Sequence, residues 1–233
     1  MKTELKQAKV IAFDLDGTLV DSITDLTLSA NAMRTYLDMP PMDTKTLETY
    51  VGDGLAKLVH RALAGNKEGT VNEALWEKGF EYYLNHYAQH LTDNTRPYKD
   101  VKDVLILLKI MGYPLAVITN KNELFATQIL KNLGLLEYIS IVIGGDTLPE
   151  KKPSSLPLNH VTEIFNIHPS ELVMVGDSTN DIKAAYNAKS LFIGVTYGYE
   201  PNLQKIAQAQ QLPYVFLTPE FSKLYDEFKK VQP

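Results

Sequence analysis

The stretch VIAFDLDGTLVDS, residues 10 to 22, decides the fold, because a short apolar run ends in two aspartates separated by one leucine. A run rich in β-branched and aromatic residues predicts a buried strand, and side chains two residues apart in an extended chain project to the same side. Two like charges about 5 Å apart at an effective dielectric constant of about 20 repel by about 3 kcal/mol. Asp14 and Asp16 therefore need a nearby cation or proton.

A β-hairpin is the competing interpretation of this stretch, since Asp16-Gly17 is a common two-residue hairpin turn. A half-exposed hairpin strand should alternate apolar and polar residues, whereas residues 10 to 13 are continuously apolar, as in a strand buried on both faces. This pattern weakens the hairpin interpretation, and the rest of the chain has to decide between the two.

The bulk composition excludes several classes of protein. The chain has 233 residues, a formal net charge of -5 and no cysteine. The length suits one large domain or a domain with a sizeable insertion. The acidic balance argues against a general nucleic-acid surface, and the lack of cysteine excludes a disulfide scaffold or a thiolate metal site. The first ten residues lack the apolar core of a signal peptide, and charge, proline or glycine interrupts every long apolar stretch before it reaches membrane-spanning length. We therefore expect a cytoplasmic protein with neither a nucleic-acid nor a membrane partner.

The segments after residue 100 alternate between helical patterns and short β-branched runs, which predicts βαβ units and a parallel sheet covered on both faces. The expected strands are residues 114–119, 139–143, 172–175, 191–195 and 214–217. Between residues 21 and 91 no convincing strand appears, and the apolar spacing is helical. The sequence thus predicts an α/β fold with a core of residues 1–20 and 94–233 and a helical cap of residues 21–93 inserted after the first strand.

Three helices are expected in the cap, because Pro40-Pro41 separates a first from a second and residues 64–70 separate the second from a third. Four aromatic residues on one face of the third helix indicate packing rather than a cofactor site. They are Trp76, Phe80, Tyr83 and Tyr87. His86 and His90 have the spacing of a metal-binding pair but lack an intervening acid, so we expect them to be structural.

Polar residues follow several of the expected strands. In an open parallel sheet, ligands bind beyond the carboxyl ends of the strands, so these residues should meet at one edge. Besides Asp14 and Asp16, they are Thr119, Asn120, Lys121, Lys151, Lys152, Asp177 and Asp181. Asp177 or Asp181 alone could cap a helix, but four carboxylates at one edge favour a metal site.

Phosphoryl transfer is the chemistry that fits this set. Carboxylates are hard oxygen ligands suited to a Mg²⁺ ion that also contacts substrate phosphate. Asp14 could attack phosphorus as a nucleophile, and Asp16 is placed to protonate the leaving oxygen and later to activate water. Lys152, Thr119 and the backbone N–H of Asn120 could stabilise the negative charge of the transferring group.

The motifs DLDGTLVDS, VITNK, KKP and GDSTND, in this order, resemble the four motifs of the haloacid dehalogenase superfamily of magnesium phosphatases. The resemblance implies a Rossmann-like core with a helical cap inserted after the first strand. It also implies Asp14 as nucleophile, Asp16 as general acid and base, and Mg²⁺ held by Asp14, the Asp16 carbonyl and Asp177, with Asp181 supporting the metal site. Lys152, directly before proline, matches the lysine motif.

Four further stretches resemble the phosphoglycolate phosphatase branch: VGDGLAKLVHRAL, RPYKDV, GYPLAVITNK and TYGY. Residues Gly52, Asp53 and Gly54 could offer backbone N–H groups to the carboxylate of phosphoglycolate, although Asp53 is an anion where that branch often has a neutral residue. Lys57 and Arg61 on the following helix could steer an anionic substrate or be solvated.

The resemblance implies a Mg²⁺-dependent phosphoric monoester hydrolase that acts on a small phosphorylated metabolite, with 2-phosphoglycolate as the preferred candidate. In that assignment Thr119, Asn120 and Lys152 also contact the substrate. Three alternatives remain: a sugar phosphomutase, another small-molecule phosphatase on the same scaffold, and a non-catalytic phosphate-binding regulatory module.

Overall fold

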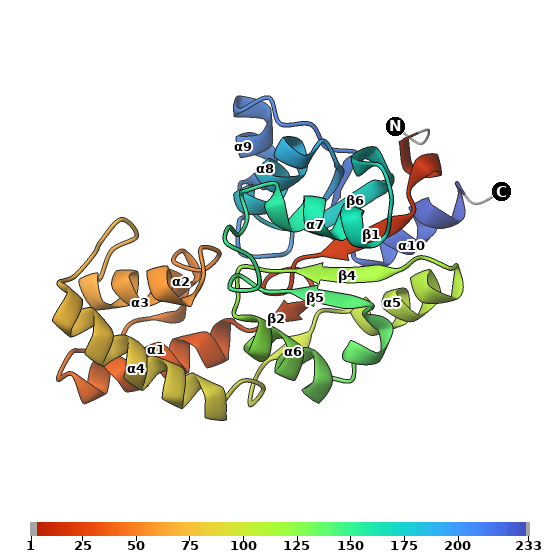
Figure 1. The fold of residues 1–233 in the computed structure, drawn as a ribbon. Helices are drawn as coiled ribbons and strands as arrows, with labels where there is room; N and C mark the ends of the chain where they lie inside the picture. The colour runs from red at the N-terminus through yellow and green to blue at the C-terminus, as the bar shows by residue number, and fades with distance from the viewer. Residues whose placement is uncertain (1–3, 232–233) are drawn as a thin grey trace.

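A computed structural model describes residues 4–231 of the chain, and its centre is a six-stranded sheet in which all paired strands run parallel (Figure 1). The strand order is β5-β4-β1-β6-β7-β8. The bounds are β1 Val10–Phe13, β4 Leu115–Ile118, β5 Ile141–Ile143, β6 Leu172–Gly176, β7 Leu191–Val195 and β8 Phe216–Thr218. The expected strands are confirmed, although β8 begins two residues later than the sequence pattern suggested.

β1 lies in the middle of the sheet between β4 and β6, and its residues are at most 1 % exposed. This position explains why residues 10 to 13 are continuously apolar, since both faces of the strand are covered. The hairpin interpretation is therefore wrong, because β1 pairs in parallel with strands more than 100 residues away in sequence. The parallel α/β fold class is confirmed.

Alternate residues of β1 enter two separate apolar cores, one on each face of the sheet. Helices α5, α6 and α10 contribute to one core, and helices α7, α8 and α9 contribute to the other. Their bounds are α5 Val101–Ile110, α6 Glu123–Asn132, α7 Leu156–Ile164, α8 Thr179–Ala188, α9 Leu203–Ala209 and α10 Ser222–Lys229. Three short 3₁₀ helices, Glu4–Gln7, Leu136–Tyr138 and Pro169–Glu171, complete this part of the structure.

A helical insertion separates β1 from the other strands of the sheet and lies to one side of it in Figure 1. It consists of α1 Ile23–Tyr36, α2 Thr44–Glu48, α3 Leu55–Ala64 and α4 Glu73–Gln89. A two-stranded antiparallel pair, β2 Val20–Asp21 with β3 Arg96–Pro97, forms the two crossings between insertion and sheet. The described residues thus contain four helices here, not three, because the segment after Pro41 is broken where Gly52 and Gly54 adopt φ values of +114° and +88°.

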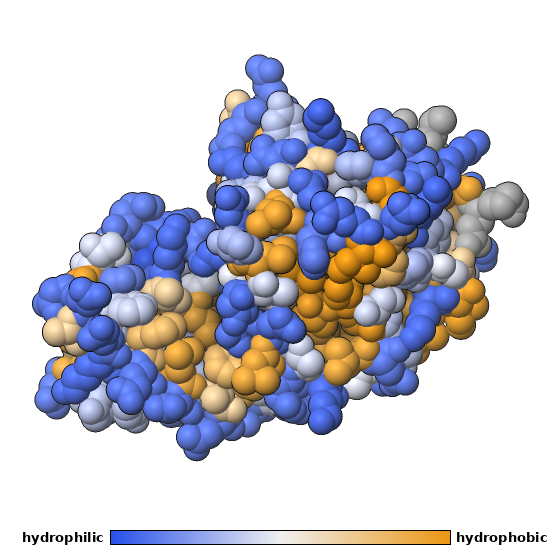
Figure 2. Space-filling model, viewed as in Figure 1, coloured by the Kyte–Doolittle hydropathy of each residue, from blue (hydrophilic) through white to orange (hydrophobic). Residues whose placement is uncertain are grey.

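The aromatic stripe on α4 serves packing, as expected, both within the insertion and, through Tyr87, against Phe125 of α6. Tyr83 and Tyr87 are fully buried with ring centroids 5.7 Å apart, and Trp76 stacks on Phe80 at 4.7 Å. On the face shown in Figure 2, hydrophilic residues cover much of the insertion, whereas apolar residues gather over β4 and β5. Among the described residues, no helix combines the length and the apolar character that a membrane span requires.

Asp25 fastens α1 to the segment that returns to the sheet. Its carboxylate is 1 % exposed and accepts hydrogen bonds from the backbone N–H groups of Asn94 and Thr95 and from both of their side chains. Although burial alone would raise the pKa of Asp25, these hydrogen bonds hold it below its ordinary value. The crossing segments are therefore held by a fully hydrogen-bonded buried anion.

Candidate active site

Asp14 and Asp16 follow β1 at the carboxyl edge of the sheet, and each is paired with its own buried lysine. Lys152 Nζ lies 2.9 Å from Asp14 Oδ1, and Lys121 Nζ lies 2.8 and 2.7 Å from the two carboxylate oxygens of Asp16. The need for positive charge that the sequence predicted is thus met in part by two ammonium groups. The motifs imply Mg²⁺ in this role and do not imply a part for Lys121 in it.

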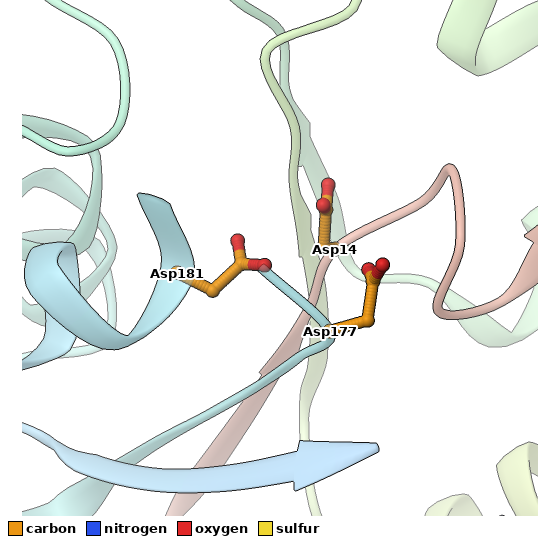
Figure 3. A group of neighbouring side chains, drawn as sticks. All are labelled: Asp14, Asp177 and Asp181. Carbon is orange, nitrogen blue, oxygen red and sulfur yellow. The ribbon is translucent and has the colours of Figure 1, made fainter. Parts of the chain in front are cut away.

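A cluster of three carboxylates forms where β1, the loop after β6 and the first turn of α8 meet (Figure 3). Asp14, Asp177 and Asp181 each offer one oxygen, and these oxygens lie within 4.8 Å of one another. Figure 3 shows Asp14 and Asp177 side by side, with Asp181 directed towards them from α8. The Asp16 carboxylate does not belong to this cluster, since it faces Lys121.

Burial and mutual repulsion perturb the acids of the cluster. Burial raises the pKa of Asp14 to about 7, the neighbouring Asp181 adds to this rise, and the Lys152 ammonium opposes it. Burial and the charges of Asp181 and Asp14 raise the pKa of Asp177 well above its ordinary value. Because three buried carboxylates resist joint ionisation, the cluster suits a divalent cation, and carboxylate oxygens are ligands that Mg²⁺ accepts.

Glycines hold the backbone close around the cluster. A Cβ at Gly17, where φ is +85°, would clash with the Asp177 carboxylate, and a Cβ at Gly198 would meet the same side chain from the other side. A Cβ at Gly176 would likewise clash with Asp181. The glycines of the DGT, YGY and GDS stretches therefore allow the backbone to approach both acids.

Asp181 combines the two roles that the sequence left as alternatives. Its Oδ2 accepts hydrogen bonds from the backbone N–H and the hydroxyl of Ser178, at 3.0 and 2.6 Å, and so completes a capping box at the start of α8. Its Oδ1 lies 2.6 Å from Lys152 Nζ. The helix cap fixes the carboxylate in the orientation that brings it to Asp14.

Lys152 joins the cluster to the end of β4. Its side chain is 2 % exposed, and its Nζ also donates to the carbonyl of Ile118, the last residue of β4. Burial alone would lower the pKa of Lys152, but the carboxylates of Asp14 and Asp181 raise it above the ordinary value. Lys151 instead points to the insertion and donates to the Asp53 carbonyl at 2.7 Å. The preference for Lys152 over Lys151 at the site agrees with this geometry.

Thr119 and Asn120 follow β4 at the same edge. The backbone N–H of Thr119 donates to Ile143 at 2.9 Å and continues the pairing of β4 with β5. The Asn120 side-chain amide donates to the carbonyls of Gly52 and Lys152, at 2.9 Å each, and so connects the insertion with the loop that carries Lys152. Both residues are at least nine-tenths buried.

The loop of Gly52, Asp53 and Gly54 contacts the core through side chains from two loops and from the first turn of α8. Besides Asn120 and Lys151, Asn180 at the start of α8 donates to the Gly52 carbonyl at 3.1 Å and to Asp53 Oδ1 at 3.0 Å. These contacts place a turn of the insertion directly over the strand ends.

Arg61 holds this loop from the side of the insertion. Its guanidinium lies 2.6 Å from Asp53 Oδ2 and donates to the carbonyls of Tyr50 and Lys67. Of the two alternatives for Arg61, solvation is wrong, since the side chain is buried among groups of its own chain, and steering of an anionic substrate stays a prediction. Lys57 is exposed on α3.

The family model described as haloacid dehalogenase-like hydrolase matches residues 11–195, a range that runs from β1 to the end of β7 and contains every residue of the carboxylate cluster. The chain belongs to this family. The resemblance seen in the four motifs is confirmed, and so is the expectation of a Rossmann-like α/β hydrolase fold.

Curated relatives are named phosphoglycolate phosphatase. One from Neisseria meningitidis is 52 % identical over 199 residues, which are 85 % of this chain and 85 % of the relative. One from Chromobacterium violaceum is 46 % identical over 225 residues, which are 97 % of this chain and 98 % of the relative. A crystal structure of a "predicted phosphoglycolate phosphatase" from Haemophilus somnus has a TM-score of 0.87 and 35 % identity, and covers 97 % of this chain and 99 % of its own. The expected enzyme class, a phosphoric monoester hydrolase similar to phosphoglycolate phosphatases, is confirmed.

The cleft of this hydrolase has a narrow inner part and a wider outer part. The inner compartment has a free volume of about 30 Å³. It is lined by Asp14, Asp16, Leu26, Val51, Gly52, Gly54, Leu55, Leu58, Thr119, Asn120 and Lys121. The outer part has about 280 Å³ and extends past Asp177 and Tyr199 to Glu48 and Lys67. A space of 30 Å³ corresponds to roughly two water molecules, so the insertion encloses the inner compartment tightly.

Three residues at the site of this hydrolase received no role from the sequence. Lys121 pairs with Asp16, Ser22 donates its hydroxyl to Asp16 Oδ1 at 2.5 Å, and Tyr199 donates its backbone N–H to Asp177 Oδ2 at 2.8 Å. Lys121 lies in VITNK and Tyr199 in TYGY, two stretches that resemble the family. Their positions in these stretches are the sequence signal that could have assigned them to the site.

His86 on α4 and His90, the residue that caps its C-terminus, contact other residues of the insertion. His86 Nδ1 lies 3.1 Å from the Ser29 hydroxyl, and His90 Nδ1 lies 2.7 Å from Asp93. Within residues 4–231, the one group of three or more potential metal ligands is the aspartate cluster.

Proposed function

We propose that this hydrolase is a Mg²⁺-dependent phosphatase that hydrolyses 2-phosphoglycolate through an aspartyl-phosphate intermediate. The observation that carries the proposal is the position of Asp14, which faces Lys152 on one side and the carboxylates of Asp177 and Asp181 on the other. The names of the relatives support the choice of substrate.

The three acids of the cluster would hold the metal ion. The donor set of Asp14, Asp177 and Asp181 consists of carboxylate oxygens only, and the raised pKa values of Asp14 and Asp177 indicate an uncompensated demand for positive charge. Mg²⁺ supplies charge neutralisation of the phosphate and of the acids around it when it is bound. The Asp16 carbonyl, proposed as a further ligand, lies two residues after Asp14 in the same loop.

The two aspartates after β1 divide the reaction between them. Asp14 attacks phosphorus, the bond to the glycolate oxygen breaks, and Asp16 gives a proton to that oxygen. In the second step Asp16 takes a proton from a water molecule, which attacks the aspartyl phosphate and releases inorganic phosphate. Lys152, Thr119 and the backbone N–H of Asn120 stabilise the oxygens of the transferring group.

Residues 21–93 act as the cap and the rest of the chain as the core in this proposal. The loop of Gly52, Asp53 and Gly54 closes the inner compartment, so the backbone N–H groups at the start of α3 are available to the substrate carboxylate. The names of the relatives favour a phosphatase over the sugar phosphomutase alternative.

The experiment is phosphate release from 2-phosphoglycolate by the purified protein with excess Mg²⁺. We expect turnover by the wild type and its loss in Asp14→Asn. Asp103→Asn, which changes an exposed aspartate on α5, is the matched control and should retain turnover. Release of phosphate by the wild type that does not exceed the Asp14→Asn background would refute the proposed function.

A further inference from the structure

Lys121 is the cation of the inner compartment. Of the described residues that line it, Lys121 alone has a positively charged side chain. The side chain is 1 % exposed, and its Nζ lies 5.1 Å from the centroid of the Tyr87 ring. Its ammonium makes two hydrogen bonds, both to the carboxylate of Asp16. An ammonium buried in this way is costly unless an anion accompanies it, so its partner is either Asp16 or an anion that replaces it.

The other cations near the strand ends are already engaged. Lys152 contacts Asp14, Asp181 and the Ile118 carbonyl, and Arg61 contacts Asp53 and two carbonyls. Their partners are parts of the metal cluster and of the cap loop. Lys121 differs because its one anionic partner, Asp16, is a side chain that the proposed reaction needs at the ester oxygen.

The neutral polar side chains of the inner compartment are already assigned. Thr119 serves the phosphoryl group in the proposed function, and the Asn120 amide donates to two backbone carbonyls, so neither is left for a second anionic group. The roof of the compartment consists of the apolar side chains of Leu26, Val51, Leu55 and Leu58. A carboxylate in such surroundings needs a cation or several N–H donors. Beside Lys121, the compartment offers the start of α3, a ten-residue helix that begins at Leu55 after the N-cap Gly54, with no side-chain cap.

We propose that Lys121 is a specificity-determining residue, which binds the carboxylate of the substrate in exchange for Asp16. The inference rests on the proposed function and identifies the group that selects an acid as the leaving part of the substrate. In phosphoglycolate the carboxyl carbon is two bonds from the ester oxygen. Asp16 acts on the ester oxygen, and Lys121 contacts Asp16. A carboxyl group only two bonds from that oxygen therefore lies within reach of the Lys121 ammonium.

The exchange also connects recognition with catalysis. Asp16 keeps the hydrogen bond from the Ser22 hydroxyl when Lys121 turns to the substrate, so the carboxylate is not left without a partner. Released from two hydrogen bonds, Asp16 can turn to the ester oxygen. A phosphoester of the same length that has no anionic group leaves Lys121 on Asp16, and it is a poorer substrate for that reason.

The test compares 2-phosphoglycolate with 2-hydroxyethyl phosphate, in which a neutral hydroxymethyl group replaces the carboxylate. In Lys121→Met we expect kcat/KM to fall for both esters, because Asp16 loses its partner, and to fall a further 10- to 100-fold for phosphoglycolate alone, the usual range for a lost charge-assisted hydrogen bond. Lys131→Met, which removes an exposed lysine at the end of α6, is the matched control and should leave the ratio of the two kcat/KM values unchanged. Equal losses on the two esters would overturn the inference.

If Lys121→Met turns over neither ester, the inference is tested by measuring how tightly the two esters bind. In an Asp14→Asn background, calorimetry should show that Lys121→Met weakens binding of phosphoglycolate at least tenfold more than binding of 2-hydroxyethyl phosphate. An equal effect on both ligands would show that Lys121 serves Asp16 only. Failure of the wild type to hydrolyse phosphoglycolate refutes the proposed function itself, whereas normal wild-type turnover with an unchanged ester ratio in Lys121→Met refutes only this inference.

Discussion

Replacement of Asp14 by Asn should stabilise the metal-free protein while it abolishes turnover. Burial and the neighbouring Asp181 raise the pKa of Asp14 from 3.8 to about 7, against the opposing charge of Lys152. The ionised side chain therefore destabilises the folded state at neutral pH. One pKa unit corresponds to about 1.36 kcal/mol. Removal of the Asp14 charge should therefore raise the free energy of unfolding by at most about 4 kcal/mol above pH 7.

The stabilisation of Asp14→Asn relative to the wild type should depend on pH. Between the unfolded pKa of 3.8 and the folded pKa of about 7, the folded state retains a proton at Asp14 that the unfolded state has lost. Stability of the wild type therefore falls as pH rises through this window and is level above it. Asp14→Asn lacks this decline, so the difference between the two proteins should be close to zero at pH 4 and largest above pH 7.

The assay is thermal unfolding in EDTA from pH 4 to pH 8, where each kcal/mol raises Tm by about 2–4 °C in a chain of this size. Asp103→Asn, an exposed substitution, should differ from the wild type by no more than about 0.5 kcal/mol at any pH. Added Mg²⁺ should stabilise the wild type more than Asp14→Asn, because the variant lacks a proposed ligand. A metal-free Asp14→Asn protein that melts at or below the wild-type temperature at pH 8 would refute the repulsion on which this reasoning depends.

Three further predictions concern residues that surround the site. Asp25→Asn should lower the free energy of unfolding by about 2–4 kcal/mol at pH 7, because one carboxylate oxygen that accepts from Thr95 is lost. In urea titrations the difference should shrink as the pH falls below about 4, because the unfolded chain then binds a proton at Asp25 while the lowered pKa keeps the folded carboxylate ionised. Asn180→Ala removes one hydrogen bond to the Gly52 carbonyl and one to Asp53, so KM for phosphoglycolate should rise roughly 3- to 10-fold in steady-state assays. An unchanged KM would show that these bonds do not hold the loop. Tyr83→Phe deletes a buried hydroxyl that has no partner among the described residues, so Tm should stay the same or rise, and a fall of several degrees would count against this reading.

The sheet was predictable because its signals are local. Each strand is a short β-branched run, and the burial of β1 on both faces is visible as continuous apolar character in residues 10 to 13. The division of the helical insertion into four helices was harder to predict from the sequence. The break between α2 and α3 depends on Gly52 and Gly54 at positive φ, and the contacts that fix this turn come from Asn120 and Asn180, far away in sequence.

The acids of the site were predictable for a topological reason. Parallel strands end at one edge, so residues that directly follow β1 and β6 must be neighbours, and Asp14 and Asp177 are such residues. Asp181 follows from the capping box, which fixes its carboxylate one turn into α8. None of these positions requires knowledge of long side chains or of loop conformations.

The lysines were harder to assign, because a four-carbon side chain can reach in several directions from the same loop. Lys151 and Lys152 are adjacent, yet one reaches the cap and the other the carboxylate cluster. Lys121 lies two residues after Thr119 and could have been solvated, and only the folded structure shows it buried against Tyr87 and Asp16. The same property makes Lys121 suited to a change of partner, since an ammonium on a flexible stem can leave one carboxylate for another with little movement of the backbone, whereas the acids held by β1 and α8 cannot. In this hydrolase the rigid groups are therefore the ones we assign to the metal, and the flexible group is the one we assign to the choice of substrate.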